Sequence, residues 1–182
     1  MSDISDRALL QVLSARHEIS NLIARYCISI DDRDLRTLIG LFTDDAYFGS
    51  SDGSRGAHTK QSIFDYFRGR FEIMGPSYHW SHDRLIEPLS ADEAEGRILA
   101  HVEMSVNGQG YVGGLRYHDR YRREDGIWKI ARRAYDSLYL VPTQSYGRAL
   151  NSVKRVWAYG EWYEADIPEK LDTWTGWRDV PL

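Results

Sequence analysis

The order of hydrophobic patterns along the chain is the feature that most limits its fold. Apolar residues between about 6 and 30 recur at helical spacing, and further helices are expected over 35–42 and from 59 to about 71. Beyond these, the pattern favours strands, over 78–87, 94–106, 114–124 and 128–141. Helices followed by a run of strands predict an α+β fold, in which a curved antiparallel sheet wraps around the N-terminal helices as a cone-shaped barrel.

Short polar segments connect these elements. Thr43-Asp44-Asp45 is expected to form a turn before a short strand at 46–48, and 50–56 is expected to form a loop. Glu124-Asp125-Gly126 is typical of a tight hairpin turn. The glycines at 108, 110, 113 and 114 are expected to lie in the connection between two strands.

The chain divides into a domain at 1–145 and an aromatic-rich extension at 146–182. We expect the extension to pack on the domain, as a lid or as part of a subunit interface. The extension is aromatic from Tyr146 onward and contains four tryptophans, Trp157, Trp162, Trp174 and Trp177.

Composition narrows the class of protein. A chain of 182 residues with 42% hydrophobic content can bury one core. The net charge of -4 gives no electrostatic footprint for nucleic acid or an anionic membrane. A single cysteine, Cys27, excludes an internal disulfide, and neither a signal-peptide pattern nor a membrane-spanning apolar run is present. We therefore expect a cytoplasmic protein without a nucleic-acid or membrane partner.

Three acidic residues follow the first helix, where the helix dipole disfavours negative charge. Asp32 or Asp34 can cap the next helix, which leaves Asp31 available for chemistry. His79 opens the first long strand, and a carboxylate that fixes one imidazole nitrogen leaves the other free to accept a proton. The alternatives are a helix cap for Asp31 and a half-buried structural histidine for His79.

Several segments between residues 8 and 140 resemble the SnoaL-like branch of the nuclear-transport-factor-two-like superfamily. They are Tyr26-x4-Asp31 with Arg33-Asp34, Leu41-Phe42-Thr43-Asp44-Asp45-Ala46, His79, Ser90-Ala91-Asp92, Tyr117-x-Asp119-x-Tyr121 and Asp125-Gly126-Ile127-Trp128-Lys129-Ile130. Within that branch the chain is similar to scytalone dehydratases, hexachlorocyclohexane dehydrochlorinases and bile-acid dehydratases. In these enzymes an Asp–His dyad is the base of an elimination, and members commonly form dimers or trimers.

The resemblance implies a catalytic set of Asp31, His79, Tyr26 and Arg133. Tyr26 or Arg133 would assist the leaving oxygen or the developing anion. The alternatives are a core position for Tyr26 and an ion pair between Arg133 and Asp119 or Asp136. The same register implies that four further residues face the cavity and bind the substrate, namely Phe48, Val102, Tyr117 and Tyr135.

The sequence also departs from these relatives. Val102 and Met104 stand where some relatives place a second histidine or an aspartate, and Ile30 replaces a tyrosine of the scytalone dehydratases. His79 and His82 are three apart in a strand, so they point to opposite faces and cannot easily chelate one metal. We expect no metal and no cofactor.

These features predict a cofactor-independent lyase of the dehydratase type, acting on a small hydrophobic, aromatic molecule in aromatic-compound catabolism. Three alternatives stay open. One is a lyase that cleaves an aromatic diol with release of formaldehyde, and another is an isomerase or cyclase resembling ketosteroid isomerase. The last is a binding module without catalysis. By resemblance, the chain is also expected to form a homo-oligomer, a dimer or a trimer.

Overall fold

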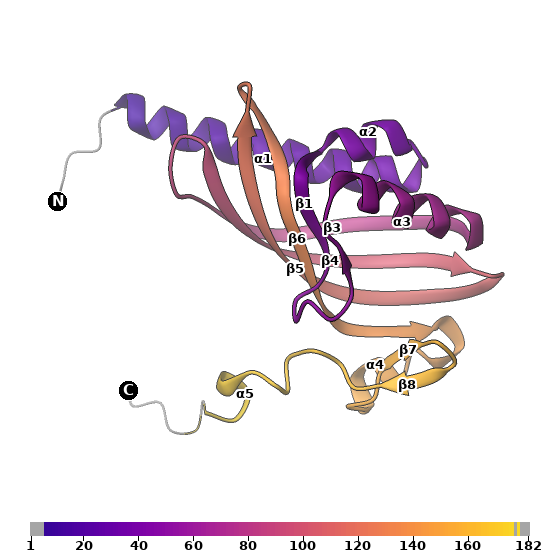
Figure 1. Cartoon of the computed structure of the whole chain (residues 1–182). Helices are drawn as coiled ribbons and strands as arrows, with labels where there is room; N and C mark the ends of the chain where they lie inside the picture. The colour runs from indigo at the N-terminus through magenta and orange to yellow at the C-terminus, as the bar shows by residue number, and fades with distance from the viewer. Residues whose placement is uncertain (1–5, 177, 179–182) are drawn as a thin grey trace.

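Three helices and a long curved sheet form the main body of the molecule (Figure 1). A computed structural model describes residues 6–176 and 178. The helices are α1 (Asp6–Asp31), α2 (Leu35–Gly40) and α3 (Lys60–Ile73). The strands are β1 (Phe42–Ser50), β2 (Gly56–Ala57), β3 (Met74–Pro88), β4 (Glu93–Val106), β5 (Gln109–Glu124) and β6 (Ile127–Pro142). The predicted α+β class is confirmed.

The sheet runs in the order β2-β1-β6-β5-β4-β3. Neighbours from β3 to β6 pair antiparallel, as expected from their short hairpin turns. β1 instead pairs parallel with β6, with Phe48 opposite Arg133 and Ser50 opposite Tyr135. The sheet is therefore mixed, and it curves without closing, so it forms an open cone and not a sealed barrel.

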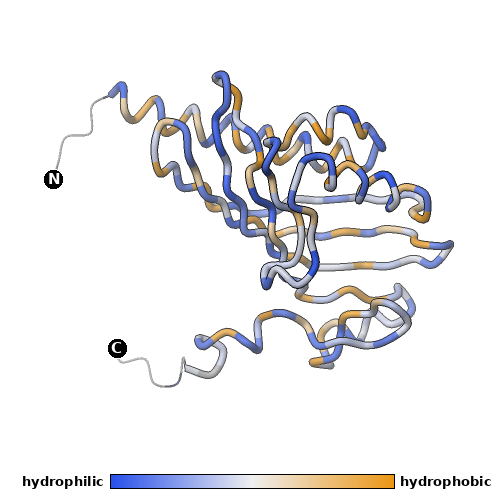
Figure 2. The backbone as a smooth tube through the Cα atoms, in the orientation of Figure 1, coloured by the Kyte–Doolittle hydropathy of each residue, from blue (hydrophilic) through white to orange (hydrophobic). Residues whose placement is uncertain are grey.

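The first helix buries one face against the sheet. Its buried side chains are spaced three or four apart, and Figure 2 shows hydrophobic and hydrophilic residues alternating along it. After the helix, Arg33 takes a positive φ of 56°, and the Asp34 side chain caps α2 by accepting from the Thr37 amide at 3.0 Å. This confirms the predicted cap. Arg33 also donates to the Gly75 carbonyl at 3.2 Å, which holds the end of α1 beside the start of β3.

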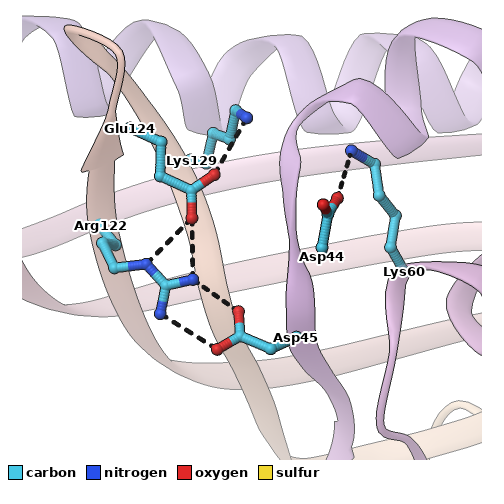
Figure 3. Close-up of polar contacts among 6 residues, drawn as sticks. All are labelled: Asp44, Asp45, Lys60, Arg122, Glu124 and Lys129. Atoms are coloured by element: carbon cyan, nitrogen blue, oxygen red, sulfur yellow. Dashed lines mark hydrogen bonds and ion pairs between the residues drawn. The ribbon is translucent and has the colours of Figure 1, made fainter.

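The acidic segment at 43–45 lies inside β1 instead of forming a turn. A register shift between Phe42 and Tyr47 lets the strand continue past it. Both aspartates point outward into ion pairs, from Asp45 to Arg122 at 2.6 Å and from Asp44 to Lys60 at 3.2 Å (Figure 3). Such exposed pairs contribute little to stability. The burial of Phe42 and Ala46 on either side decides the conformation of the segment.

The glycines at 110, 113 and 114 lie within β5 and not in a connection, because the chain already reverses at Asn107-Gly108. Those two residues have φ of 50° and 76°. A Cβ atom on Gly114 would lie 2.7 Å from the Tyr139 ring. A Cβ atom on Gly113 would lie 3.1 Å from the side chains of Val102 and Leu140. Glycine at these positions therefore permits close packing across the sheet.

The C-terminal extension docks along the end of β6 (Figure 1). It contains a 3-10 turn (Thr143–Ser145), α4 (Arg148–Asn151), β7 (Val156–Ala158), β8 (Glu161–Tyr163) and α5 (Asp172–Gly176). β7 joins the sheet at Leu140, and the Arg155 side chain donates to the Leu138 carbonyl at 2.6 Å and pairs with Glu169 at 2.7 Å. Trp157 and Trp162 pack edge to face, whereas Trp177 lies outside the described residues. A lid or interface role for this segment stays a prediction. No helix among the described residues has the length and apolar character that crossing a membrane requires.

Candidate active site

A largely apolar cavity of about 170 Å³ lies between the helices and the concave face of the sheet. Residues of α1 and α3 form one side of the cavity, and residues of strands β1, β3, β4, β5 and β6 form the other. Apolar side chains dominate the lining, among them Ile30, Phe48, Phe67, Phe71, Val102 and Leu115. A groove elsewhere on the sheet is larger, about 260 Å³, but charged residues line most of it. Apolar cavities with a few convergent polar groups are the typical sites for small molecules, so this cavity is the candidate site.

Asp31 and His79 meet at the wall of this cavity. The His79 ring, with 15% of its side chain exposed, lines the cavity, and its Nδ1 lies 2.6 Å from Oδ1 of Asp31. The Asp31 carboxylate also accepts from the His79 backbone amide at 2.8 Å and from the Ser77 hydroxyl at 3.0 Å. The contact between the end of α1 and the start of β3 thus brings together two residues 48 positions apart.

The hydrogen bonds fix the charge of Asp31 and the tautomer of His79. Burial disfavours the ionised carboxylate, but the donors from His79 and Ser77 outweigh it and hold the pKa of Asp31 below its ordinary value. An ionised carboxylate only accepts, so Nδ1 of His79 carries the hydrogen. Nε2 of His79 is therefore the nitrogen left free to accept a proton.

Four tyrosines line the cavity, and three of them, Tyr26, Tyr117 and Tyr135, add phenol groups that are buried or partly buried. Tyr26 and Tyr117 are buried, Tyr135 is partly buried, and none of the three hydroxyls is hydrogen bonded to another described residue. Burial raises the pKa of Tyr135 to about 12 and raises the pKa of Tyr26 and of Tyr117 as well. All three hydroxyls therefore stay protonated near neutral pH. Buried polar groups are normally satisfied, so these donors point to a ligand or water as their partner.

Arg133 lies behind the cavity and does not line it. Its guanidinium forms an ion pair with Asp119, with Nε at 3.0 Å from Oδ1 and a terminal nitrogen at 2.5 Å from Oδ2, and both side chains are almost fully buried. The alternative that the sequence left open, an ion pair with Asp119, is thus present. The guanidinium carbon also lies 4.0 Å and 4.8 Å from the ring centres of Tyr26 and Tyr117. Arg133 therefore contacts two tyrosines that line the cavity, but not the cavity itself.

The remaining histidines of the strands lie away from the cavity. The rings of His82 and His101 are 6.3 Å apart on the other face of the sheet, and His118 pairs there with Asp136 at 2.8 Å. Within residues 6–176 and 178, no group of three or more His, Cys, Asp or Glu side chains is arranged to hold a metal ion. The polar side chains that line the cavity are those of His79, four tyrosines, Arg70 and Ser137.

Phe48, Val102, Tyr117 and Tyr135 all line the cavity, but sequence reasoning missed several other lining residues, of which three are polar, Tyr66, Arg70 and Ser137. Helical spacing contained a signal for Arg70, because it lies three residues after the buried Phe67 on the face of α3 that meets the sheet. Ser137 lies two residues after Tyr135 in β6, before the register shift that follows it, so strand alternation contained a signal for Ser137 as well.

Comparisons with known proteins agree with this fold. Residues 11–134 match the SnoaL-like domain. An uncharacterised protein of Mycobacterium tuberculosis is 32% identical over 143 residues, which cover 73% of this chain and 93% of that protein. The gamma-hexachlorocyclohexane dehydrochlorinase of Sphingobium indicum is 24% identical over 144 residues, which cover 73% of this chain and 86% of the relative.

Solved structures give the same result at lower identity. A structure described as a putative scytalone dehydratase, from Novosphingobium aromaticivorans, superposes with a TM-score of 0.68 at 18% identity and covers 82% of this chain and 95% of its own. A hexachlorocyclohexane dehydrochlorinase from Novosphingobium barchaimii superposes with a TM-score of 0.66 at 22% identity and covers 73% of this chain and 92% of its own. These likenesses concern the fold.

Proposed function

The chain belongs to the SnoaL-like domain family, and we propose that it is a cofactor-independent lyase in which His79 is the general base. The observation that carries the proposal is the 2.6 Å hydrogen bond from Nδ1 of His79 to Asp31, with the rest of the ring facing an apolar cavity. The substrate that suits this cavity is small, hydrophobic and aromatic. The dehydrochlorinase among the relatives is named for an elimination, which agrees with this chemistry.

In the proposed reaction, Nε2 of His79 accepts a proton from a substrate carbon. The electron pair of the broken C–H bond forms the new double bond, and the leaving group departs from the neighbouring carbon with its own bonding pair. Asp31 stabilises the imidazolium that results. When the leaving group is hydroxide, the imidazolium can return its proton, so the products are an alkene and water.

The cavity phenols would act on the side where negative charge develops. Tyr26 and Tyr117 are neutral donors held in a fixed position by ring contacts with each other and by the guanidinium of Arg133. Preorganised donors in a dry site stabilise a developing anion without further rearrangement. Arg133 thus becomes a positioning residue for the two tyrosines instead of a direct partner of the substrate.

A neutral probe can test the base without knowledge of the natural substrate. In 5-nitrobenzisoxazole, removal of the ring C–H proton forms a nitrile and breaks the N–O bond, and the oxygen leaves as a coloured phenolate. We expect the wild-type protein to accelerate this elimination in the presence of a metal chelator. His79→Ala and Asp31→Asn should each lower the rate by about 100-fold or more.

His82→Ala is the matched control, because His82 lies three residues further along β3 and faces away from the cavity. It should keep the wild-type rate, and circular dichroism should show that all variants are folded. A wild-type rate no higher than that of His79→Ala would overturn the proposal. With a natural substrate, deuterium uptake from solvent into a product of unchanged formula would identify an isomerase instead of a lyase.

A further inference from the structure

Arg70 presents an unpaired guanidinium to the cavity. It lies in the last turn of α3 and lines the cavity beside Tyr66 and Phe71. Among the described residues, its one hydrogen-bond contact is weak, from a terminal nitrogen to Sδ of Met104 at 3.9 Å. No carboxylate among the described residues forms an ion pair with it, whereas the neighbouring Arg68 pairs with Asp65 at 3.3 Å. A cation beside an apolar wall is costly unless an anion accompanies it.

The other polar groups of the cavity cannot supply that anion. The phenols are neutral donors, and the Asp31 carboxylate already accepts three hydrogen bonds from Ser77 and His79. Apart from the free nitrogen of His79, the cavity therefore offers mainly donors and one full positive charge. Burial raises the pKa of Tyr66, and the positive charge of Arg70 partly offsets that rise.

Arg70 and His79 lie at different places along the cavity wall, so one can bind an anion while the other accepts a proton. His79 pairs with Val102 across β3 and β4, and the guanidinium of Arg70 contacts Met104. Val102 and Met104 are two residues apart on one face of the strand, a step of about 7 Å. A single bound molecule can therefore meet the base with one end and the guanidinium with the other.

We propose that Arg70 binds the carboxylate of the substrate, so the molecule processed here is an aromatic carboxylic acid. Arginine matches a carboxylate through two parallel hydrogen bonds, and the apolar lining formed by Phe48, Phe67 and Phe71 accommodates the ring. The cavity of about 170 Å³ suits a single-ring acid. The identification of this acid as a substrate rests on the proposed lyase function, but the anion site can be tested without turnover.

The test is a calorimetric titration with two probes of nearly equal shape, trans-cinnamate and the neutral cinnamamide. We expect the wild-type protein to bind cinnamate at least 10-fold more tightly than cinnamamide. Arg70→Gln should remove this preference by weakening cinnamate binding alone, and Arg70→Lys should keep part of it. Arg68→Gln, two residues earlier on α3, is the matched control and should keep the full preference.

Equal affinity of the wild-type protein for the two probes would overturn the inference, and so would an unchanged preference in Arg70→Gln. Titration measures binding and needs no catalysis, so its result is independent of the result of the elimination test. A protein that prefers cinnamate but does not open 5-nitrobenzisoxazole would refute the lyase and leave the anion site standing. A protein that opens 5-nitrobenzisoxazole but binds the two probes equally would refute the anion site alone.

Discussion

The guanidinium carbon of Arg133 lies 4.0 Å from the ring centre of Tyr26, while the same guanidinium forms a buried ion pair with Asp119. The Tyr121 hydroxyl donates to that carboxylate at 2.6 Å, so Asp119 is satisfied from two sides. A cation over an aromatic face adds electrostatic attraction to the packing. One charged cluster thus supports both the core and the ring that presents its hydroxyl to the cavity.

Breaking this cluster should destabilise the whole fold. Arg133→Met would leave the Asp119 carboxylate buried without its partner, which costs about 3–5 kcal/mol. Urea unfolding measures the change. The double variant Arg133→Met with Asp119→Leu removes both charges at once. Its free energy of unfolding should therefore fall by much less than the sum of the decreases in the two single variants. Additive losses would contradict the coupling described for this pair.

The site could be predicted from sequence where a local rule acted. Asp31 ends α1, and the capping preference at a helix start offered Asp32 or Asp34 for α2, which left Asp31 for His79; the structure uses Asp34 as the cap. The register of the family resemblance likewise placed Val102 and Tyr117 on the cavity face, where both side chains lie. The capping prediction needed only neighbours in the chain, whereas the cavity positions came from the resemblance.

Other features depend on contacts between distant segments, and sequence patterns did not reveal them. The parallel pairing of β1 with β6 joins residues more than 80 positions apart, so no turn signal announces it. Arg70 was missed because a charged residue on a helix normally faces solvent, and only the position of Met104 on β4 shows what lies opposite. Gly113 was predicted to lie in a turn, but it leaves room for the side chain of Leu140 on the neighbouring strand. That contact joins distant segments, so the sequence around Gly113 does not indicate it.

Removal of the α2 cap should cost a measurable part of the stability. The Asp34 side chain accepts from the Thr37 amide at 3.0 Å, and loss of such a cap costs about 1 kcal/mol. Asp34→Ala should therefore lower the free energy of unfolding by about that amount. Asp32→Ala is the control, because the Asp32 side chain forms no hydrogen bond or ion pair with another described residue. Equal losses in the two variants would exclude the cap as the cause.

Acid should remove the stabilisation that Asp31 provides. Its pKa is lower in the folded chain than the ordinary value of 3.8, so the folded state favours the ionised carboxylate. This contribution is complete above the ordinary pKa and is lost as the pH falls through the lowered, folded-state pKa. The stability difference between the wild-type protein and Asp31→Asn should therefore be constant from neutral pH to about pH 4 and then shrink.

Urea midpoints across this range give the measurement for Asp31. Asp32→Asn, one residue further along, should give a difference from the wild-type protein that stays small at every pH. If the difference for Asp31→Asn grew as the pH fell, the hydrogen bonds from His79 and Ser77 would not be the source of the lowered pKa.

Ser77 should act on the reaction only through Asp31. Its hydroxyl donates to Oδ1 of Asp31 at 3.0 Å, and the side chain does not line the cavity. A hydrogen bond to a charged group contributes about 1.5–3 kcal/mol, so Ser77→Ala should lower kcat for 5-nitrobenzisoxazole by about tenfold or more and leave KM unchanged. Ser77→Thr keeps a hydroxyl and should recover most of the rate.

A second measurement separates this positioning role from a merely structural one. In Ser77→Ala, the carboxylate loses one of its donors, so the pKa of Asp31 should rise toward its ordinary value, and the acid loss of stability should be smaller and end at a higher pH than in the wild-type protein. A purely structural serine would lower stability equally at every pH and would leave kcat unchanged. If Ser77→Ala showed that pattern, His79 would owe its orientation to the two hydrogen bonds it makes with Asp31 itself.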